Sequence, residues 1–138
     1  MLPETYIKAA LATFAQKEAA QYGGIDNMLA VCFVIRNRMD AGWFGGDWLL
    51  AMEKAGDVAA NSEAPEPQPF NLRETRYRKF LERIDAIFDG TELDVMTEGA
   101  LYYGELNKPL RPWFVEHITE DIENHRHVAT VGPVWFFL

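Results

Sequence analysis

The chain contains little cysteine, few basic residues and no long apolar run. Only one of its 138 residues, Cys32, is a cysteine, so no disulfide forms within the chain and cysteine usage leaves the redox compartment open. Lysine and arginine together number 13 against 21 aspartates and glutamates, which gives a formal net charge of −8. Nucleic acids and anionic membranes both attract a basic surface, so this excess of acid argues against either partner.

Signals for targeting and for cofactors are also missing. No apolar stretch approaches the roughly 20 residues of a membrane-spanning helix, and the opening segment MLPETYIK does not have the pattern of a signal peptide. We therefore expect synthesis in the cytoplasm, with delivery by another system if the target lies outside it. The sequence has neither a glycine-rich phosphate loop nor a CxxC pair, so we expect no nucleotide, metal or other cofactor.

Apolar residues, by contrast, are abundant. The chain is 49% hydrophobic and 13% aromatic, which is typical of a globular protein, and its length fits a single domain spanning residues 1–138. Apolar periodicity and capping signals predict helices at about Pro3–Gly23, Asp26–Met39, Trp48–Ala55 and Asn71–Asp89, with N-caps at Asp26, Asp47 and Asn71. Two short strands are predicted around a Gly-Pro turn, at His127–Val131 and Val134–Phe137. We therefore expect an α+β, mostly α-helical fold with a small extended part near the C-terminus.

One carboxylate falls on the apolar stripe of the first expected helix. Ile7, Leu11, Phe14 and Tyr22 form that stripe, and Glu18 lies on it, four residues after Phe14. An unpaired charge on a buried face costs several kcal/mol, and the C-terminal end of a helix is partially negative. Both effects favour the protonated form of Glu18, which is how a glutamate becomes a general acid near neutral pH.

Other interpretations of the polar residues stay open. Glu18 can be a structural glutamate paired with Arg36 or Arg38 of the next helix. Cys32 together with a histidine would make a thiol nucleophile, although its LAVCFVI setting is typical of a buried core residue. A metal site is a further alternative, because His-x-His spacing can place two imidazoles on one side of a strand; its ligands would be His117, His125 and His127.

Several short motifs, taken in their order along the chain, resemble one known family. They are FAQKEAAQYGG, IRNR at Ile35–Arg38, QPF at Gln68–Phe70, TEGALYY at Thr97–Tyr103, PW at Pro112–Trp113 and VGPVWFF at Val131–Phe137. Their order is similar to that of the SleB-type cell wall hydrolases, the spore-cortex-lytic family that also occurs among phage lysins. The chain departs from the family pattern at Ala20–Tyr22, where the family has Arg-Gly-Glu, and at Val134, where it has a histidine.

The resemblance implies a lysozyme-like fold that cleaves the glycan strands of peptidoglycan, as a lytic transglycosylase or a muramidase. The family's catalytic glutamate falls on Glu18, which would act as general acid and then as base, while the 6-hydroxyl of muramic acid supplies the attacking oxygen. Hydrolysis would instead need a second carboxylate, for which the sequence offers Asp47, Glu98 and Glu105. Delivery to the cell wall or periplasm would then use another system, such as a phage-lysis or virion-associated route.

A glycan site needs flat apolar faces and polar partners. From the matching stretches we expect sugar contacts at Tyr102, Tyr103 and Trp113, with core packing as the alternative for each; Trp43 and Trp48 are secondary candidates. We also expect the Glu18 carboxyl to open into a cleft formed with the second helix and residues 97–103.

Two further polar residues, Thr97 and Asn37, are candidates for hydrogen bonds near the acid, or else ties within a loop. Two rival functions follow from the same residues. One is a non-catalytic relative that binds glycan or another protein through the same groove. The other is a zinc-dependent amidase that uses the three histidines.

Overall fold

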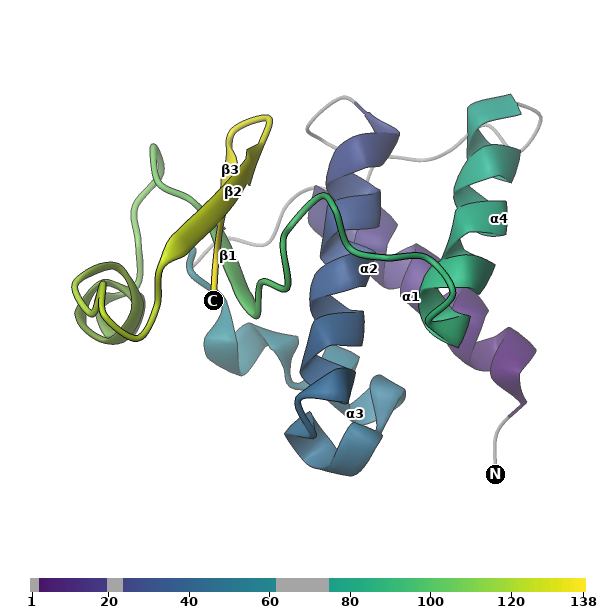
Figure 1. Cartoon of the computed structure of the whole chain (residues 1–138), viewed down its shortest axis with the longest axis horizontal. Coiled ribbons are helices and arrows are strands. Elements are labelled where there is room, and N and C mark those ends of the chain that lie inside the picture. Colours follow the sequence, from purple (N-terminus) through teal and green to yellow (C-terminus); the bar gives the residue numbers. More distant parts are fainter. Residues whose placement is uncertain (1–2, 20–23, 62–74) are drawn as a thin grey trace.

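The helices α1 (Glu4–Ala19), α2 (Ile25–Asp40) and α4 (Thr75–Asp89) pack together on one side of the molecule (Figure 1). The computed structural model describes residues 3–19, 24–61 and 75–138. The predicted positions of Tyr22, of the QPF motif and of the capping pair Asn71–Glu74 lie outside the described residues. No helix in the described part of the chain has the length and apolar character needed to cross a membrane.

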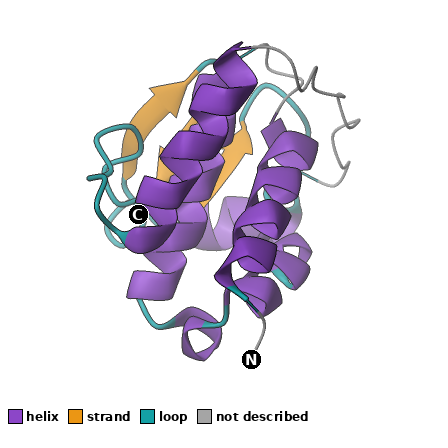
Figure 2. Ribbon diagram, turned by 90° about the vertical axis from the view of Figure 1, so that its right-hand side faces the viewer, coloured by secondary structure: helices purple, strands orange, loops and turns teal. Residues whose placement is uncertain are grey.

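A small antiparallel sheet completes the fold. Its strands β1 (Tyr102–Glu105), β2 (His127–Val131) and β3 (Val134–Phe137) lie in the order β1-β3-β2. In Figure 2 the long helices lie in front of these strands. The α+β, mostly helical prediction is therefore confirmed, and the β2–β3 hairpin has the predicted bounds.

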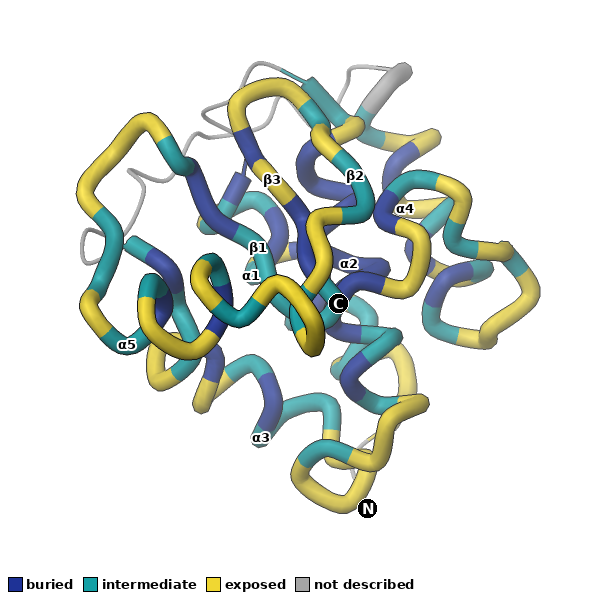
Figure 3. The backbone as a smooth tube through the Cα atoms, turned by 60° about the vertical axis from the view of Figure 1, so that its left-hand side comes forward, coloured by how far each residue is buried: buried dark blue, intermediate teal, exposed yellow. Residues whose placement is uncertain are grey.

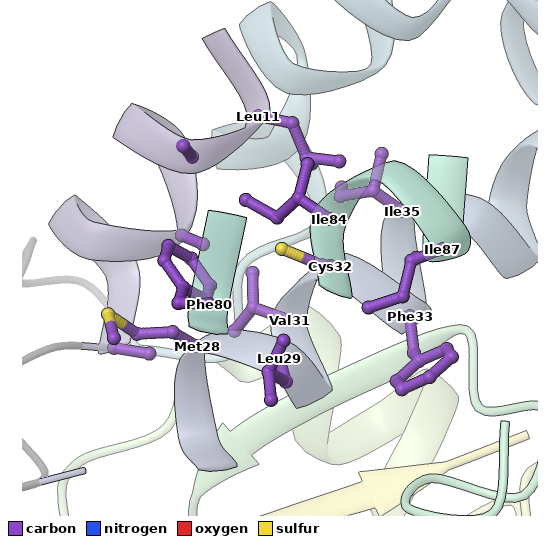
Figure 4. Close-up of a cluster of buried hydrophobic side chains, with 13 residues drawn as sticks. Leu11, Met28, Leu29, Val31, Cys32, Phe33, Ile35, Phe80, Ile84 and Ile87 are labelled. Atoms are coloured by element: carbon purple, nitrogen blue, oxygen red, sulfur yellow. The ribbon is translucent and has the colours of Figure 1, made fainter. Parts of the chain in front are cut away.

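Helix α2 is the element shared by both layers. Its face toward α1 and α4 belongs to an apolar cluster drawn in Figure 4, whose members include Leu11, Met28, Cys32, Phe80, Ile84 and Ile87. On the opposite face, Ala30 and Val34 pack with Val134 and Phe136 of β3. Figure 3 shows the consequence, because α2 is buried along much of its length while the turn between β2 and β3 is exposed.

Short helices cover the other face of the sheet, and others follow the C-terminal end of α2. Phe137 of β3 packs with Phe114 of α5 (Pro112–Phe114) and Ile118 of the π-turn η4 (Val115–Thr119). The segment after α2 contains the 3-10 turn η2 (Trp43–Gly46), helix α3 (Trp48–Glu53) and the 3-10 turn η3 (Ala55–Val58).

One predicted helix cap is confirmed, while a second predicted cap and one predicted helix end are wrong. Asp47 caps α3, since its side chain accepts a hydrogen bond of 3.1 Å from the Leu50 amide. Asp26 is not an N-cap: α2 begins at Ile25, its cap residue is Gly24, and Asp26 lies inside the first turn, where a carboxylate still complements the helix dipole. The third helix ends at Glu53 rather than Ala55, because the backbone tightens into η3.

Candidate functional site

Glu18 lies in the last described turn of α1, facing strand β1. The Tyr103 hydroxyl donates a hydrogen bond of 3.4 Å to Oε2 of Glu18, which joins two residues far apart in the sequence. Tyr103 is itself held by stacking on Phe136 of β3, with ring centroids 5.9 Å apart. The apolar stripe predicted this inward direction, since Leu11 is fully buried and Phe14 packs against the core. The carboxyl is thus partly buried between a helix end and the sheet.

The protonation of Glu18 follows from that position. Burial raises the pKa of Glu18 above its ordinary value, because the charged form loses solvation. The hydrogen bond from Tyr103 and the charges of Lys17 and Arg38 work in the opposite direction without cancelling the rise. A carboxyl with a raised pKa keeps a proton to give at higher pH than a solvated glutamate does.

The structural alternative for Glu18, an ion pair with Arg36 or Arg38, is wrong for the described residues. Arg36 forms an ion pair with Asp40, N to O 3.1 Å, and donates to the Phe88 carbonyl. Arg38 donates from Nε to the Leu101 carbonyl at 2.9 Å. The charge of Arg38 still acts on Glu18 through space, so the arginine is a neighbour of the acid without being its salt-bridge partner.

The aromatic candidates separate into two places. Trp43, a secondary candidate from sequence, lies edge-to-face against Tyr102 at 5.5 Å, and the guanidinium of Arg38 lies 5.0 Å from its ring centroid. Tyr102 also contacts His125, with ring centroids 5.1 Å apart. Trp43 and Tyr102 therefore lie together beside Arg38, and Tyr103, the next residue of β1, donates to Glu18.

Trp113 and Trp48 lie elsewhere. Trp113 packs, as Tyr102 does, at the margin of the apolar cluster around Phe114. Its indole N–H is buried and has no hydrogen-bond partner among the described residues. Trp48 packs on Phe88 of α4 with ring centroids 4.8 Å apart. Both positions match the core-packing alternative stated for them.

Asn37 and Thr97 bind the same aspartate, which sequence reasoning missed. Asn37 donates to Oδ2 of Asp94 at 2.9 Å and to the Ala100 carbonyl at 3.0 Å, and the buried Thr97 hydroxyl also donates to Oδ2. The Thr97 amide donates to Oδ1 at 2.7 Å, and the Gly99 amide to Oδ2 at 3.0 Å. Burial alone would raise the pKa of Asp94, but these donors outweigh burial and hold it below the ordinary value. Asn37 and Thr97 thus tie the loop that leads into β1, as the loop alternative proposed.

The spacing Asp94-x-x-Thr97 is the signal that could have revealed this loop. An aspartate commonly accepts hydrogen bonds from backbone amides two and three residues later, and here Met96 and Thr97 supply them. The sequence reading treated this stretch as irregular because neither helical nor strand periodicity is present.

The candidate second carboxylates differ in what they do. Asp47 is occupied as the cap of α3. Glu98 is exposed in a turn with φ 52°. Glu105 is buried on β1, two residues after Tyr103 and therefore on the same face of the strand, and its Oε2 lies 2.8 Å from the Lys108 ammonium.

The residues of the thiol and metal alternatives do not come together in the described residues. Cys32 is fully buried in the apolar core, and burial raises the pKa of its thiol, which disfavours a thiolate. His125 donates from Nδ1 to the Leu138 carbonyl at 2.7 Å, His127 stacks on Trp135 at 4.1 Å, and His117 is exposed in η4. Across the described ranges, no group of three or more histidine, cysteine, aspartate or glutamate side chains is placed to hold a metal ion.

Comparisons with protein-family models, with curated proteins and with solved structures found no match to this chain. What the site can do chemically therefore rests on its own geometry. That geometry is one partly buried carboxyl with a raised pKa, a tyrosine hydroxyl bound to it, and a buried cation and aromatic rings beside it.

Proposed function

We propose that this protein cleaves the glycan strands of peptidoglycan, with Glu18 as the general acid and base, in the manner of a lytic transglycosylase or a muramidase. The observation that carries the proposal is the Glu18 carboxyl, partly buried at the end of α1, bound by the Tyr103 hydroxyl and raised in pKa. The motif order that resembles the SleB-type hydrolases supports the same assignment from the sequence. The protein would be made in the cytoplasm and delivered to the cell wall or periplasm by another system.

In the transglycosylase form one carboxyl is sufficient. Glu18 gives its proton to the glycosidic oxygen as the bond from the muramic acid C1 to that oxygen breaks. The resulting carboxylate then takes the proton from the muramic acid 6-hydroxyl, whose oxygen bonds to C1 and leaves a 1,6-anhydro end. Tyr103 holds Oε2 throughout, so it both orients the carboxyl and stabilises the carboxylate between the two proton transfers.

In the muramidase form water replaces the 6-hydroxyl and a second carboxylate assists. Among the sequence candidates Glu105 is the best supported, because it shares a strand face with Tyr103 while Asp47 is occupied as a helix cap. Its carboxylate also lies 2.8 Å from the Lys108 ammonium, at the end of the same strand.

For sugar binding we propose Tyr102 and Tyr103, with Trp43 added to them. Tyr103 donates to the acid, and Tyr102 and Trp43 contact each other beside Arg38. Trp113 contacts the same apolar cluster as Tyr102 but has no described contact with Arg38 or Glu18. Asn37 and Thr97 would act indirectly, by fixing the loop from Asp94 to Ala100 that positions β1.

The decisive variant is Glu18→Gln, which keeps the size and hydrogen-bonding capacity of the side chain but cannot transfer the proton. Turnover of purified peptidoglycan should fall by roughly 10²–10⁴-fold or more. Glycan binding should persist, and the melting temperature should stay level or rise, because a neutral amide suffers less from partial burial than an acid. Mass spectrometry of the digest gives the products, and anhydro ends distinguish transglycosylation from hydrolysis.

The matched control is Glu4→Gln, which removes an exposed carboxylate from the other end of α1. It should leave product yield unchanged. Products that persist at the wild-type rate in a folded Glu18→Gln protein would refute the assignment of the acid. Wild-type protein that binds glycan without forming any product would favour the non-catalytic binding function instead.

A further inference from the structure

Arg38 is a buried cation without a carboxylate partner among the described residues. Only 2% of its surface is exposed, and its side chain leaves α2 toward the start of β1. There its Nε donates to the Leu101 carbonyl at 2.9 Å, and its guanidinium lies 5.0 Å from the ring of Trp43. Among the other described arginines, Arg36 and Arg83 reach the carboxylates of Asp40 and Glu92, whereas the less buried Arg111 donates to the carbonyls of Gly56 and Ala59.

Such a charge is expensive for the fold. A buried cation loses its hydration, and a carbonyl and an aromatic face return less of that energy than an ion pair does. An apolar side chain of the same length would fill the site at lower cost. The position of Arg38 therefore calls for a role besides packing.

The charge of Arg38 acts on the strand whose Tyr103 binds the acid and, more weakly, on the acid itself. Glu18 from α1 and Tyr102 and Tyr103 from β1 are the side chains on which the charge of Arg38 acts. Facing Glu18 in turn, within the described residues, are Tyr103 from β1, Arg38 from α2 and Lys17 from its own helix. The charge of Lys17 acts on Glu18 more strongly than that of Arg38, but Lys17 is exposed and therefore screened by salt, whereas Arg38 is buried and screened little.

We propose that Arg38 is a positioning residue for the reaction, supplying the counter-charge for the Glu18 carboxylate and fixing the start of β1 that brings Tyr103 to it. When Glu18 gives its proton to the leaving oxygen, the negative charge forms beside a cation that is already in place. No side chain has to reorganise at that moment, which is where a preorganised charge is most effective.

The catalytic part of this inference rests on the proposed function, but its electrostatic part can be measured without substrate. The experiment follows the side-chain carboxyl carbon of Glu18 by ¹³C NMR through a pH titration of the full chain, with Glu18→Gln used to assign the signal. Arg38→Met removes the charge and keeps an apolar stem, while Arg38→Lys keeps a charge and loses the planar fork. Arg36→Gln removes a charge from the same helix, at a residue bound to Asp40 and Phe88, and is the control.

We expect the titration midpoint of Glu18 to move upward in Arg38→Met, to stay near the wild-type value in Arg38→Lys and to be unchanged in Arg36→Gln. In an active enzyme, the high-pH limb of kcat/KM, above which Glu18 has lost its proton, should move upward in Arg38→Met as well. The kcat of that variant should fall by roughly tenfold or more, with a smaller change in KM, because the stabilised group forms during the reaction.

An unchanged Glu18 midpoint in folded Arg38→Met would overturn the proposal. Failure to fold by both Arg38→Met and Arg38→Gln would overturn it too, since the charge would then serve the fold. A shifted midpoint in a protein that cleaves no glycan would refute the proposed function and leave the counter-charge assignment standing. An enzyme that cleaves glycan but has the same Glu18 titration midpoint in Arg38→Met as in wild type would refute the counter-charge and leave the proposed function standing.

Discussion

The two faces of α2 are built on opposite principles. The face toward α1 and α4 is apolar, and its cluster contains no charged residue among its buried members. The side of α2 toward the sheet has buried polar groups. They include Asn27 and Arg38 of α2 itself, and Thr97 of the loop before β1, which contacts Asn37. Asn27 donates to the Val131 carbonyl at 2.8 Å, so even this polar group has a defined partner across the interface.

The apolar contacts of α2 stabilise the fold, whereas its polar contacts fix the position of β1 and the site residues. Apolar contacts are non-directional, so the helical side can hold the chain together without fixing any one group. Hydrogen bonds require particular distances and angles, and the polar side uses them to set β1 at a fixed position against α1. A proton-transferring carboxyl needs that second kind of contact, and Glu18 lies where the two kinds meet.

The largest effect on stability should come from the apolar side. Phe80→Ala removes a fully buried ring that packs against α1 and α2, and should lower the free energy of unfolding by about 3–5 kcal/mol. Because no charge is involved, the loss should be nearly the same between pH 4 and 8. Urea unfolding at several pH values measures it, with the neighbouring Leu81→Ala, which is 38% exposed, as the control. A loss as small as that of Leu81→Ala would contradict the assignment of Phe80 to the core.

The polar side should respond to pH. Asp94→Ala leaves the Asn37, Thr97 and Gly99 donors without their acceptor and should cost about 2–3 kcal/mol at neutral pH. The folded pKa of Asp94 is lowered, so its contribution is present above the ordinary value of 3.8 and is lost as pH falls through the folded pKa. The difference in the free energy of unfolding between wild type and Asp94→Ala should therefore become smaller at acidic pH.

Asp57→Ala, which removes an exposed carboxylate, is the control for that measurement and should show no such narrowing. Unfolding curves at neutral and acidic pH are compared for all three proteins. If the difference in unfolding free energy between wild type and Asp94→Ala stays constant down to strongly acidic pH, the Asp94 hydrogen bonds do not depend on its charge.

Cys32 tests whether the apolar side is free of chemistry. Cys32→Ala should lower the free energy of unfolding by roughly 1–2 kcal/mol and leave peptidoglycan cleavage intact. Since burial raises the pKa of this thiol, the folded wild type should resist a thiol reagent that modifies the unfolded chain rapidly. Abolished turnover in a folded Cys32→Ala protein would restore the thiol alternative.

The smallest effects should come from residues outside both faces. Asp47→Ala removes the cap of α3 and should cost about 1 kcal/mol. Asp26→Ala removes a carboxylate that caps nothing and only complements the dipole of α2, so it should cost roughly 0.3–0.5 kcal/mol. Thermal melting of the pair measures the difference. Equal losses would mean that the side-chain bond of Asp47 contributes nothing beyond its charge.

Sequence reasoning recovered the apolar side more completely than the polar one. Helical periodicity reports which residues face a core, so it located α1, α2 and the inward direction of Glu18. The terminal hairpin was found because a Gly-Pro turn separates two apolar runs. These signals are local, and each depends on residues within one or two turns of chain.

The missed features depend on contacts between distant residues. Strand β1 has four residues interrupted by Gly104, and it is a strand because β3 pairs with it. Asp94, in the loop before β1, owes its role to Asn37 on α2, and Trp43, only a secondary candidate from sequence, lies against a ring on β1. Arg38 was one of two partners in the ion-pair alternative for Glu18, yet its hydrogen bond goes to a backbone carbonyl that no sequence pattern identifies. The position of such partners follows from the tertiary fold.

The strand order has a consequence for how the site assembles during synthesis. Strand β3 lies between β1 and β2, so β1 cannot join the sheet until β3 has left the ribosome. A nascent chain that ends at β1 has the residues of α1 and α2 and carries Glu18, but Tyr103 has no Phe136 to hold it. The β2–β3 hairpin is a local contact that forms quickly, whereas closing β1 onto it spans a long loop and is slower. We therefore expect the acid to acquire its partner late, after β3 has been synthesised.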